Sequence, residues 1–473
     1  MSNSKNAVKA GAGYTIGNIF LKALNFLTLP IFSVILSESD YGIYSTFAAY
    51  ESIFFILIGL AIHSSYKNAK YRYDEETYHQ YVSTTMIFLI LSGIVWLVAG
   101  NVFYPFLGSL LDLDRLSVNL LIVFSFSTAV LTCFNADVAL EYKYQAYLKI
   151  SVLNAVSNIL LSVLLILTFF SGQRYTGRIV GTTIPVFLVA IYIIIRFIRR
   201  AKPIRGRNSH LKWGLKYSLP IVPHGLSQVV LSQFDRIMIK RMIGNAEAGI
   251  YSFAYNIYMI VNVISNSLDN VWCPWFYEQM NAGNKKKIKE ISSVYMSLML
   301  IFSVAVILVC PEMILILGAG KYGTSAYCAV PIIASGYFAF LYTLPAAVEY
   351  FHEKTSFIAM GTAGAALMNI VLNAIFIPRF GYVAAAYTTL ATYLLYFAVH
   401  YLLARMIQKE YLFVNKTVIL CVIGILISVA VANVFMKQIL IRWVITLVLV
   451  VVTLIYVDKK FYIREWIKRR RKN

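Results

Sequence analysis

Long apolar runs alternate with short polar links along the whole chain. Each run holds about 20 residues, which is enough for a helix to cross a hydrocarbon core of roughly 30 Å. Lipid offers no partner to backbone N–H and C=O groups, so each run must satisfy its own hydrogen bonds as a helix. We therefore predict about fourteen membrane-spanning helices. They occupy roughly residues 13–36, 41–63, 82–104, 116–138, 150–171, 177–198, 213–235, 248–272, 291–317, 327–350, 356–377, 381–404, 415–435 and 438–457.

Composition and charge support this class and orient it. Hydrophobic residues make up 59% of the 473 and charged residues 13%, so we predict an all-α polytopic membrane protein. The net charge of +21 would suit nucleic acid, but Lys and Arg are spread over the links and the tail, and we expect no such partner. With the N-terminus inside, the inner segments carry 31 Lys and Arg and the outer links 10. The positive-inside rule then predicts that both termini are cytoplasmic.

The short links argue against an enzyme. None exceeds about twenty residues, so no soluble catalytic domain fits between the spans. The segment 318–322 (GAGKY) lacks the spacing and the hydroxyl residue of a phosphate-binding loop. The five cysteines are scattered and form no CxxC, so we expect no metal site and no cofactor. We therefore do not expect an enzyme.

The two halves of the chain repeat each other. Tyr41-Gly-Ile-Tyr-Ser45 opens one span and Ala248-Gly-Ile-Tyr-Ser252 opens another, 207 positions later. Five such matches lie in the same order at offsets of 204 to 211, with six spans between the copies. This predicts two like-oriented lobes of six helices, a parallel repeat about an axis along the membrane normal. The predicted parts are an N-lobe at 1–198, a basic link at 199–212, a C-lobe at 213–404, two extra helices at 405–457 and a basic tail at 458–473.

This arrangement resembles the multidrug/oligosaccharidyl-lipid/polysaccharide exporter superfamily. Two stretches are similar to its polysaccharide-transport branch of O-antigen-type flippases: LPIFSVILSESDYGIYSTF and FDRIMIKRMIGNAEAGIYSFAYNIYMI. The resemblance covers residues from about 10 to 457. It implies a bacterial cytoplasmic-membrane flippase for undecaprenyl-diphosphate-linked oligosaccharide in cell-surface polysaccharide biosynthesis. It further implies a cationic cavity between the lobes, an H⁺ or Na⁺ gradient as the driving force, and a polysaccharide polymerase as a partner to test.

Two charges lie inside the first two spans, Lys22 and Glu51. Ionisable groups in lipid are costly and usually face a bundle interior or a wet cavity. One interpretation is a buried ion pair that holds the two spans together. The other is a cavity cation, Lys22, that meets a diphosphate, and we include both residues as candidates for substrate binding.

The seventh span carries a second polar face. Pro220 and Pro223 interrupt the helical hydrogen-bond ladder, which predicts a kink that is either passive or a hinge for alternating access. His224 and Gln228 lie one turn apart beside this break. Such groups either join helices or line a cavity. We favour a cavity lining, since sugars need hydrogen-bonding groups.

Five further ionisable residues are candidates for coupling or gating. Asp235 and Arg236 are placed at the outer end of the seventh span, where local pairing or capping is the alternative. Asp269 lies late in the eighth span without a sequence-local partner. Glu141 and Glu349 are repeat-related carboxylates at the inner ends of the fourth and tenth spans, where a structural role is the alternative.

A basic cluster ends the second span on the cytoplasmic side. His63, Lys67 and Arg72, with Lys70 between them, could receive a diphosphate at the entrance, although orientation charge explains the basic residues as well. The basic link and the basic tail are expected to contact anionic membrane lipids.

Three rival functions remain open. A multidrug/cation antiporter of the same superfamily would need acidic cavity residues, whereas Lys22 is a cation. A lipid II flippase fits the number of helices, although the local sequence fits it less well. A membrane glycosyltransferase would need acidic residues on a sizeable external loop, and the links are too short to provide one.

Overall fold

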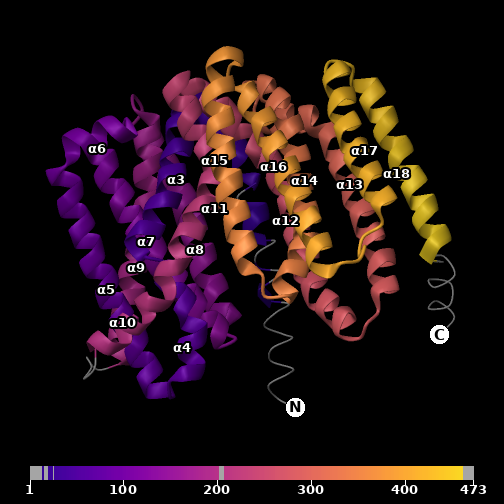
Figure 1. The fold of residues 1–473 in the computed structure, drawn as a ribbon. Coiled ribbons are helices and arrows are strands. Elements are labelled where there is room, and N and C mark those ends of the chain that lie inside the picture. The colour runs from indigo at the N-terminus through magenta and orange to yellow at the C-terminus, as the bar shows by residue number, and fades with distance from the viewer. Residues whose placement is uncertain (1–12, 15–16, 18–19, 25, 202–206, 462–473) are drawn as a thin grey trace, which may run out of the picture. The chain divides into compact units, whose positions relative to one another are not determined.

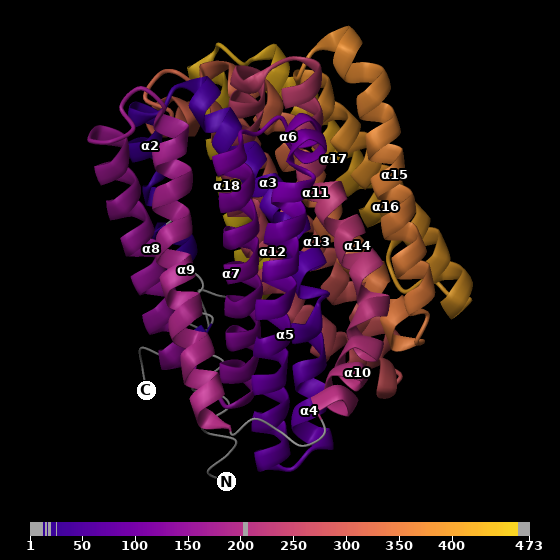
Figure 2. The same ribbon diagram turned by 90° about the vertical axis from the view of Figure 1, so that its left-hand side faces the viewer.

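The computed structural model describes residues 13–14, 17, 20–24, 26–201 and 207–461, and every regular element within them is a helix. The chain forms two compact units, Met1–Gly249 and Ile250–Asn473. In each unit the long helices lie side by side (Figures 1 and 2). The predicted all-α membrane fold is confirmed.

The first unit contains the helices up to the middle of the chain. Their bounds are α2 (Leu29–Ile35), α3 (Glu38–Gly59), η1 (Ile62–Ser65), α4 (Tyr66–Arg72), α5 (Glu75–Val102), α6 (Tyr104–Leu111), α7 (Arg115–Leu140), α8 (Tyr144–Leu167), α9 (Arg174–Arg200), α10 (Arg207–Ser218), η2 (Leu219–Ile221) and α11 (Val222–Met242). Helix α12 (Asn245–Asn281) begins in this unit and continues into the second.

The second unit contains the remaining helices. They are α13 (Lys285–Leu317), η3 (Gly323–Ser325), α14 (Ala326–Phe351), α15 (Thr355–Phe380), α16 (Val383–Gln408), α17 (Asn415–Val434) and α18 (Ile439–Phe461).

The spans agree with the predicted number. Eleven helices of the described chain are long and apolar enough to cross a membrane, and shorter apolar helices occupy Phe20–Ile35 and Ile439–Val452. The broken helix α10–η2–α11 takes the place of the seventh span, which brings the total to the predicted fourteen.

Polar side chains cap the starts of several spans. Ser37 and Asp40 form a reciprocal capping box at α3: Ser37 Oγ accepts from the Asp40 N–H at 3.0 Å, and Asp40 Oδ2 accepts from the Ser37 N–H at 3.2 Å. Asp74 accepts from the Thr77 N–H at 2.7 Å at the start of α5. These contacts satisfy backbone donors that have no partner within the helix.

Two neighbouring helices of the first unit are broken at the same level. Leu60 and Ala61 follow α3 in the left-handed region, with φ of 45° and 51°, a conformation that costs a side-chain-bearing residue about 1–2 kcal/mol. The predicted break at Pro220 is a 3-10 turn, η2. A Cβ on Gly214 would touch Ile62 and one on Gly225 would touch Ile56, so the two breaks lie opposite each other.

Two helices are much longer than the apolar pattern predicted. Helix α12 has 37 residues and ends nine beyond the predicted 272, while α13 has 33 and begins at Lys285 instead of 291. Both helices therefore extend beyond the predicted spans at their inner ends. Hydropathy locates only the segment that lipid requires to be apolar, and the polar helical ends continue past it.

The boundary between the units also differs from the predicted division into lobes. The units divide at Gly249, after α10, η2 and α11. These three elements belong with the first unit because α11 packs along α3, and α10 packs on η1 and α5. The part of the basic link at 202–206 and the tail at 462–473 lie outside the described residues.

Candidate substrate and coupling sites

The candidate charges of the first two spans do not pair with each other. Lys22 is half-buried and forms no ion pair among the described residues. Glu51 lies in α3 beside Thr128 of α7, and its Oε1 is buried without a hydrogen-bond partner. The ion pair between Lys22 and Glu51 therefore does not form. Their roles in substrate binding stay predictions.

A cation that sequence analysis did not single out lies one turn inside α9. The Arg178 guanidinium carbon is 3.7 Å from the ring centroid of Phe32 in α2 and 4.7 Å from that of Tyr44 in α3. Its Nη1 donates to Asn158 Oδ1 at 2.6 Å and to Ser162 Oγ at 2.8 Å, both in α8. Four elements of the first unit thus meet at one arginine.

The hydrogen-bonding edge of Arg178 is only partly used. Both bonds engage Nη1, and Nε and Nη2 have no hydrogen-bond partner among the described residues. Nor does Arg178 form an ion pair with any described carboxylate. An arginine held by aromatic rings and neutral groups keeps its charge and a forked pair of donors, the geometry that binds phosphate oxygens.

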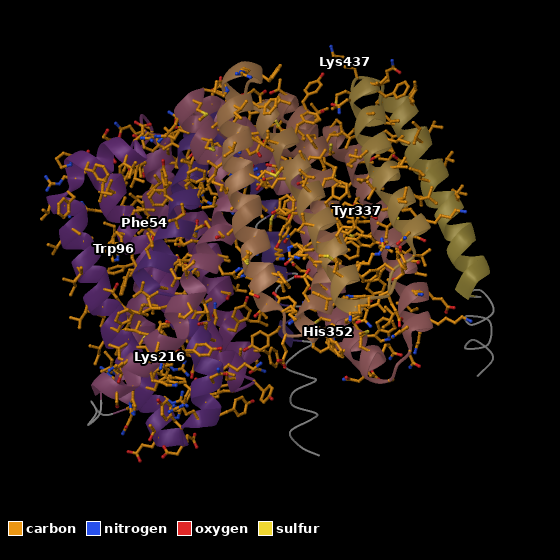
Figure 3. The ribbon with its side chains drawn as sticks, in the orientation of Figure 1. Phe54, Trp96, Lys216, Tyr337, His352 and Lys437 are labelled. Carbon is orange, nitrogen blue, oxygen red and sulfur yellow. The ribbon has the colours of Figure 1, made fainter. Side chains whose placement is uncertain are left out.

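The basic cluster His63–Lys67–Lys70–Arg72 does come together at one end of the first unit. The Arg72 guanidinium lies 5.2 Å from the ring of Trp213 in α10, and Lys70 Nζ lies 4.7 Å from the ring of Tyr78. Lys67 is exposed. Lys216 of α10 adds charge at this end (Figure 3). Burial lowers the pKa of His63, which favours the neutral form of this ring.

The polar face of α11 is present as predicted. His224 is half-buried with an Nδ1 that lacks a hydrogen-bond partner, and Gln228, one turn later, is exposed. Pro220 lies in η2 and Pro223 in the first turn of α11, both exposed. The break in the helix is therefore real, and its role as a hinge stays a prediction.

Asp235 and Arg236, predicted at the outer end of the seventh span, lie within helix α11. Helix α11 continues to Met242, and Asp235 is buried within it. The charged end of the helix belongs to Lys240, whose Nζ lies 3.0 Å from the Asp112 carboxylate and donates to the Asp112 carbonyl at 2.8 Å. The sequence could not separate these charges because the apolar run ends several residues before the helix does.

The repeat-related carboxylates occupy different environments, and in the first unit the carboxylate is paired with permanent cations. Glu141 Oε1 is 2.6 Å from Arg200 Nη2, and Glu141 Oε2 is 2.6 Å from Lys143 Nζ. Burial raises the pKa of Glu141, but the hydrogen bonds from Lys143 and Arg200 outweigh it and hold this pKa below its ordinary value. Arg200 also lies 3.6 Å from Asp137, which accepts a hydrogen bond from Tyr78 at 2.8 Å.

In the second unit the carboxylate is paired with a histidine. Glu349 of α14 and His400 of α16 both have fully buried side chains, with Glu349 Oε1 2.6 Å from His400 Nδ1. The rings of Tyr342 and Tyr396 lie 4.8 and 4.7 Å from the imidazole. Glu349 Oε2 and His400 Nε2 are buried without a hydrogen-bond partner. Sequence analysis missed His400, although it lies inside a predicted span, where an ionisable residue is a signal in itself.

Asp269, the remaining candidate, does not join this pair. It is half-buried in α12, where its carboxylate meets the side chain of Thr343 of α14 and acts electrostatically on Tyr350 and Cys273.

A comparison with known families and proteins bears on this geometry. The family model described as "Polysaccharide biosynthesis protein" matches residues 8–280. Lsg locus protein 1 of Haemophilus influenzae is 23% identical over 336 residues, covering 68% of this chain and 79% of that protein. The predicted resemblance to a polysaccharide-transport family agrees with this match.

Solved structures support the fold. The inward closed conformation of the lipid II flippase MurJ matches with a TM-score of 0.69 at 15% identity, covering 95% of this chain and 99% of that one. An inward-facing multidrug resistance MATE family transporter of the MOP superfamily matches with a TM-score of 0.64 at 14% identity, covering 82% and 96%. At these identities the likeness concerns the fold.

Proposed function

Because the chain belongs to the family of polysaccharide biosynthesis proteins, we propose that it is a flippase for polyprenyl-diphosphate-linked oligosaccharide in a bacterial cytoplasmic membrane. The glycan-diphosphate head would pass through the protein and the polyprenyl tail would stay in lipid. The fold it shares with a lipid II flippase supports the transport of a lipid-linked glycan.

The observation that carries the proposal is Arg178. Its cation lies inside a span without a carboxylate partner among the described residues, with Nε and Nη2 still available. A diphosphate concentrates negative charge, and a partly desolvated guanidinium attracts it far more strongly than one in water. In the predicted orientation, Arg178 lies near the outer face and Lys67, Lys70 and Arg72 lie at the cytoplasmic entrance. The proposed substrate path would therefore have cations at both of its ends.

A cation antiporter is a second candidate, and Glu51 is the observation that favours it. This carboxylate lies inside a span with one buried oxygen that lacks a hydrogen-bond partner. A cationic drug would need such an acid.

A variant of Arg178 distinguishes the flippase from the cation antiporter. Purified protein in proteoliposomes is given a fluorescent undecaprenyl-diphosphate-linked oligosaccharide, and wild type is compared with Arg178→Gln and with Lys22→Ala. Loss of one charged contact of about 1.5–3 kcal/mol predicts a fall in flipping of roughly ten- to a hundredfold for Arg178→Gln.

The matched control is Arg174→Gln, one turn earlier on α9. Arg174 is exposed and donates only to backbone carbonyls, that of Ile35 at 2.6 Å among them, so we expect near-normal flipping. Equal rates for Arg178→Gln and wild type would remove Arg178 from the substrate path. Export of a cationic dye that depends on Glu51, without lipid flipping, would favour the antiporter.

A further inference from the structure

The pair of Glu349 and His400 has the chemistry of a site for one proton. With one proton shared between them, as an ion pair or as neutral acid and neutral imidazole, the pair has no net charge. Removing that proton leaves a net negative charge among fully buried side chains. An uncompensated buried charge is strongly unfavourable, so burial favours the form of the pair that carries no net charge.

The corresponding helices of the first unit, α7 and α9, show which kind of partner a carboxylate has in a purely structural contact. There α7 supplies Glu141 and α9 supplies Arg200, whose guanidinium cannot lose its proton in the physiological range. In the second unit α14 supplies Glu349, and α16 supplies His400, whose imidazole, unlike a guanidinium, can exchange a proton. Two repeat-related carboxylates thus differ in whether their partner can exchange a proton.

The surroundings of the pair leave one polar atom of each residue free of hydrogen bonds to described residues. Glu349 Oε2 and His400 Nε2 are fully buried and have no hydrogen-bond partner among the described residues. Helix α15 comes so close that a Cβ on Gly361 would lie 2.3 Å from His400 Nε2, so glycine is what makes room for the imidazole.

Few titratable groups face the pair. They are Tyr342 and Tyr350 of α14, Tyr396 of α16 and, acting through Tyr350, Asp269 of α12. The Tyr396 hydroxyl is engaged by Thr362 of α15 at 2.9 Å. Within the described residues no Lys or Arg forms an ion pair with Glu349, so His400 is its one basic partner there.

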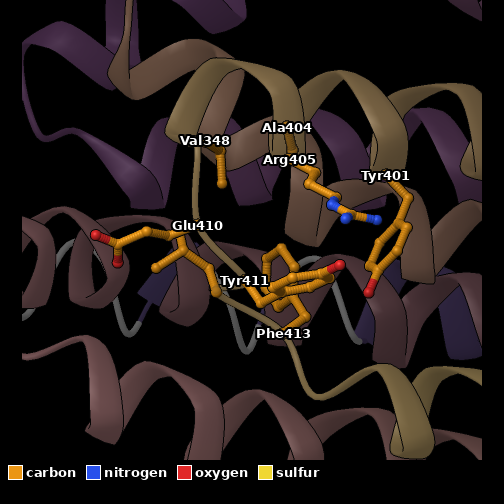
Figure 4. Close-up of a pocket in the computed structure, with 8 residues that line it drawn as sticks. Val348, Tyr401, Ala404, Arg405, Glu410, Tyr411 and Phe413 are labelled. Carbon is orange, nitrogen blue, oxygen red and sulfur yellow. The ribbon is translucent and has the colours of Figure 1, made fainter.

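A small pocket lies at the end of α14, the end of α16 and the segment that follows α16 (Figure 4). Its lining includes Val348 and Tyr401, the sequence neighbours of Glu349 and His400, and Ala404, one turn beyond His400. Arg405 lines the same pocket with its guanidinium 4.1 Å from the ring of Tyr411.

We propose that Glu349 and His400 form the proton-binding site that couples this transporter to a proton gradient. The inference rests on the proposed function and adds to it the coupling ion and its place. A proton from water on the outer side protonates the pair, which closes without net charge. Opening toward the pocket lets Glu349 and His400 return that same proton to cytoplasmic water, and no other bond is made or broken.

The test uses vesicles with and without a pH gradient. Proteoliposomes carry the same fluorescent undecaprenyl-diphosphate-linked oligosaccharide, and its final distribution across the bilayer is measured. One coupled proton per lipid predicts about a tenfold shift in that distribution per pH unit for wild type. Glu349→Gln and His400→Gln are expected to lose this shift while still equilibrating the lipid between leaflets.

The control exploits the repeat. Glu141→Gln, whose partners are permanent cations, is expected to keep the tenfold shift whatever its effect on rate. The inference is overturned if Glu349→Gln or His400→Gln responds to the gradient as wild type does. A pH-sensitive dye inside wild-type vesicles needs no variant, and lipid flipping without proton movement overturns the inference as well.

A direct readout separates this inference from the proposed function. Infrared difference spectra of the purified protein between acid and neutral pH should contain a carboxyl band that Glu349→Gln removes. That band in a protein that flips no lipid-linked oligosaccharide would leave the site standing and refute the flippase. Its absence in a protein that does flip would refute the site alone.

Discussion

The glycines of the repeated motif make a sharp prediction about packing. Gly42 of α3 and Gly249 of α12 occupy the same place in Tyr41–Ser45 and Ala248–Ser252, and both belong to the first unit. They lie directly against each other's helix. A Cβ on Gly42 would fall 1.7 Å from the Asn245 carbonyl oxygen, and one on Gly249 would fall 2.0 Å from that of Glu38.

The size of the destabilisation depends on which atoms must move to make room for the new methyl group. Both obstacles are backbone atoms, so no side-chain rotation relieves the clash and the helices must separate. Overpacking of this kind costs about 1–3 kcal/mol, against a gain of up to about 1 kcal/mol from replacing glycine by alanine in a helix. We expect Gly42→Ala and Gly249→Ala each to lower the free energy of unfolding by up to about 2 kcal/mol.

The measurement is thermal and denaturant unfolding of the purified variants in one detergent. Gly364→Ala in α15 is the matched control, because a Cβ there would meet nothing within 4 Å, and it should be neutral or stabilising. The double variant should be less destabilised than the two singles added together, since one separation of the helices accommodates both methyl groups. If Gly42→Ala is as stable as Gly364→Ala, the helices do not cross as closely as described.

Two further predictions concern ion pairs. Arg442 of α18 donates through Nη1 to Glu312 Oε2 at 2.8 Å and to the Leu308 carbonyl of α13 at 2.6 Å. In the same unfolding experiments, Arg442→Met should lower the free energy of unfolding by about 3–5 kcal/mol, because it leaves a carboxylate without its partner. Addition of Glu312→Met should restore much of the loss, and an equal loss in the double variant would contradict this. The pKa of Glu141 is held below its ordinary 4.5, so the stabilisation it provides is present above that pH and is lost as pH falls through the lowered value. Glu141→Gln should therefore melt at a lower temperature than wild type at pH 7, and the difference in melting temperature should close in acid. A difference that widens in acid would refute this pairing.

The spans and the repeat could be predicted because lipid imposes simple rules on them. Apolar length, short links and the distribution of Lys and Arg indicated fourteen spans, and the Tyr-Gly-Ile-Tyr-Ser motif occurs in the structure where two helices touch. The break at Pro220 was predictable since proline lacks a backbone N–H.

The remaining features depend on what a single sequence does not specify. The break after α3 falls at Leu60 and Ala61, neither of which is a helix-breaking residue. Arg178 lies inside the predicted span 177–198 but was not singled out, because the rotation of α9 about its axis cannot be deduced from a largely apolar run. Glu349 was a candidate, but its partner His400 lies 51 residues away and only the packing of α14 on α16 brings them together.

The most direct test of the account is transport by the wild-type protein itself. Proteoliposomes with the purified protein are given either the fluorescent undecaprenyl-diphosphate-linked oligosaccharide or a cationic dye, with protein-free vesicles as the blank. The account predicts that the protein moves the lipid-linked oligosaccharide between leaflets and leaves the dye at the rate of the blank. Movement of the dye with no movement of the lipid-linked oligosaccharide would contradict it.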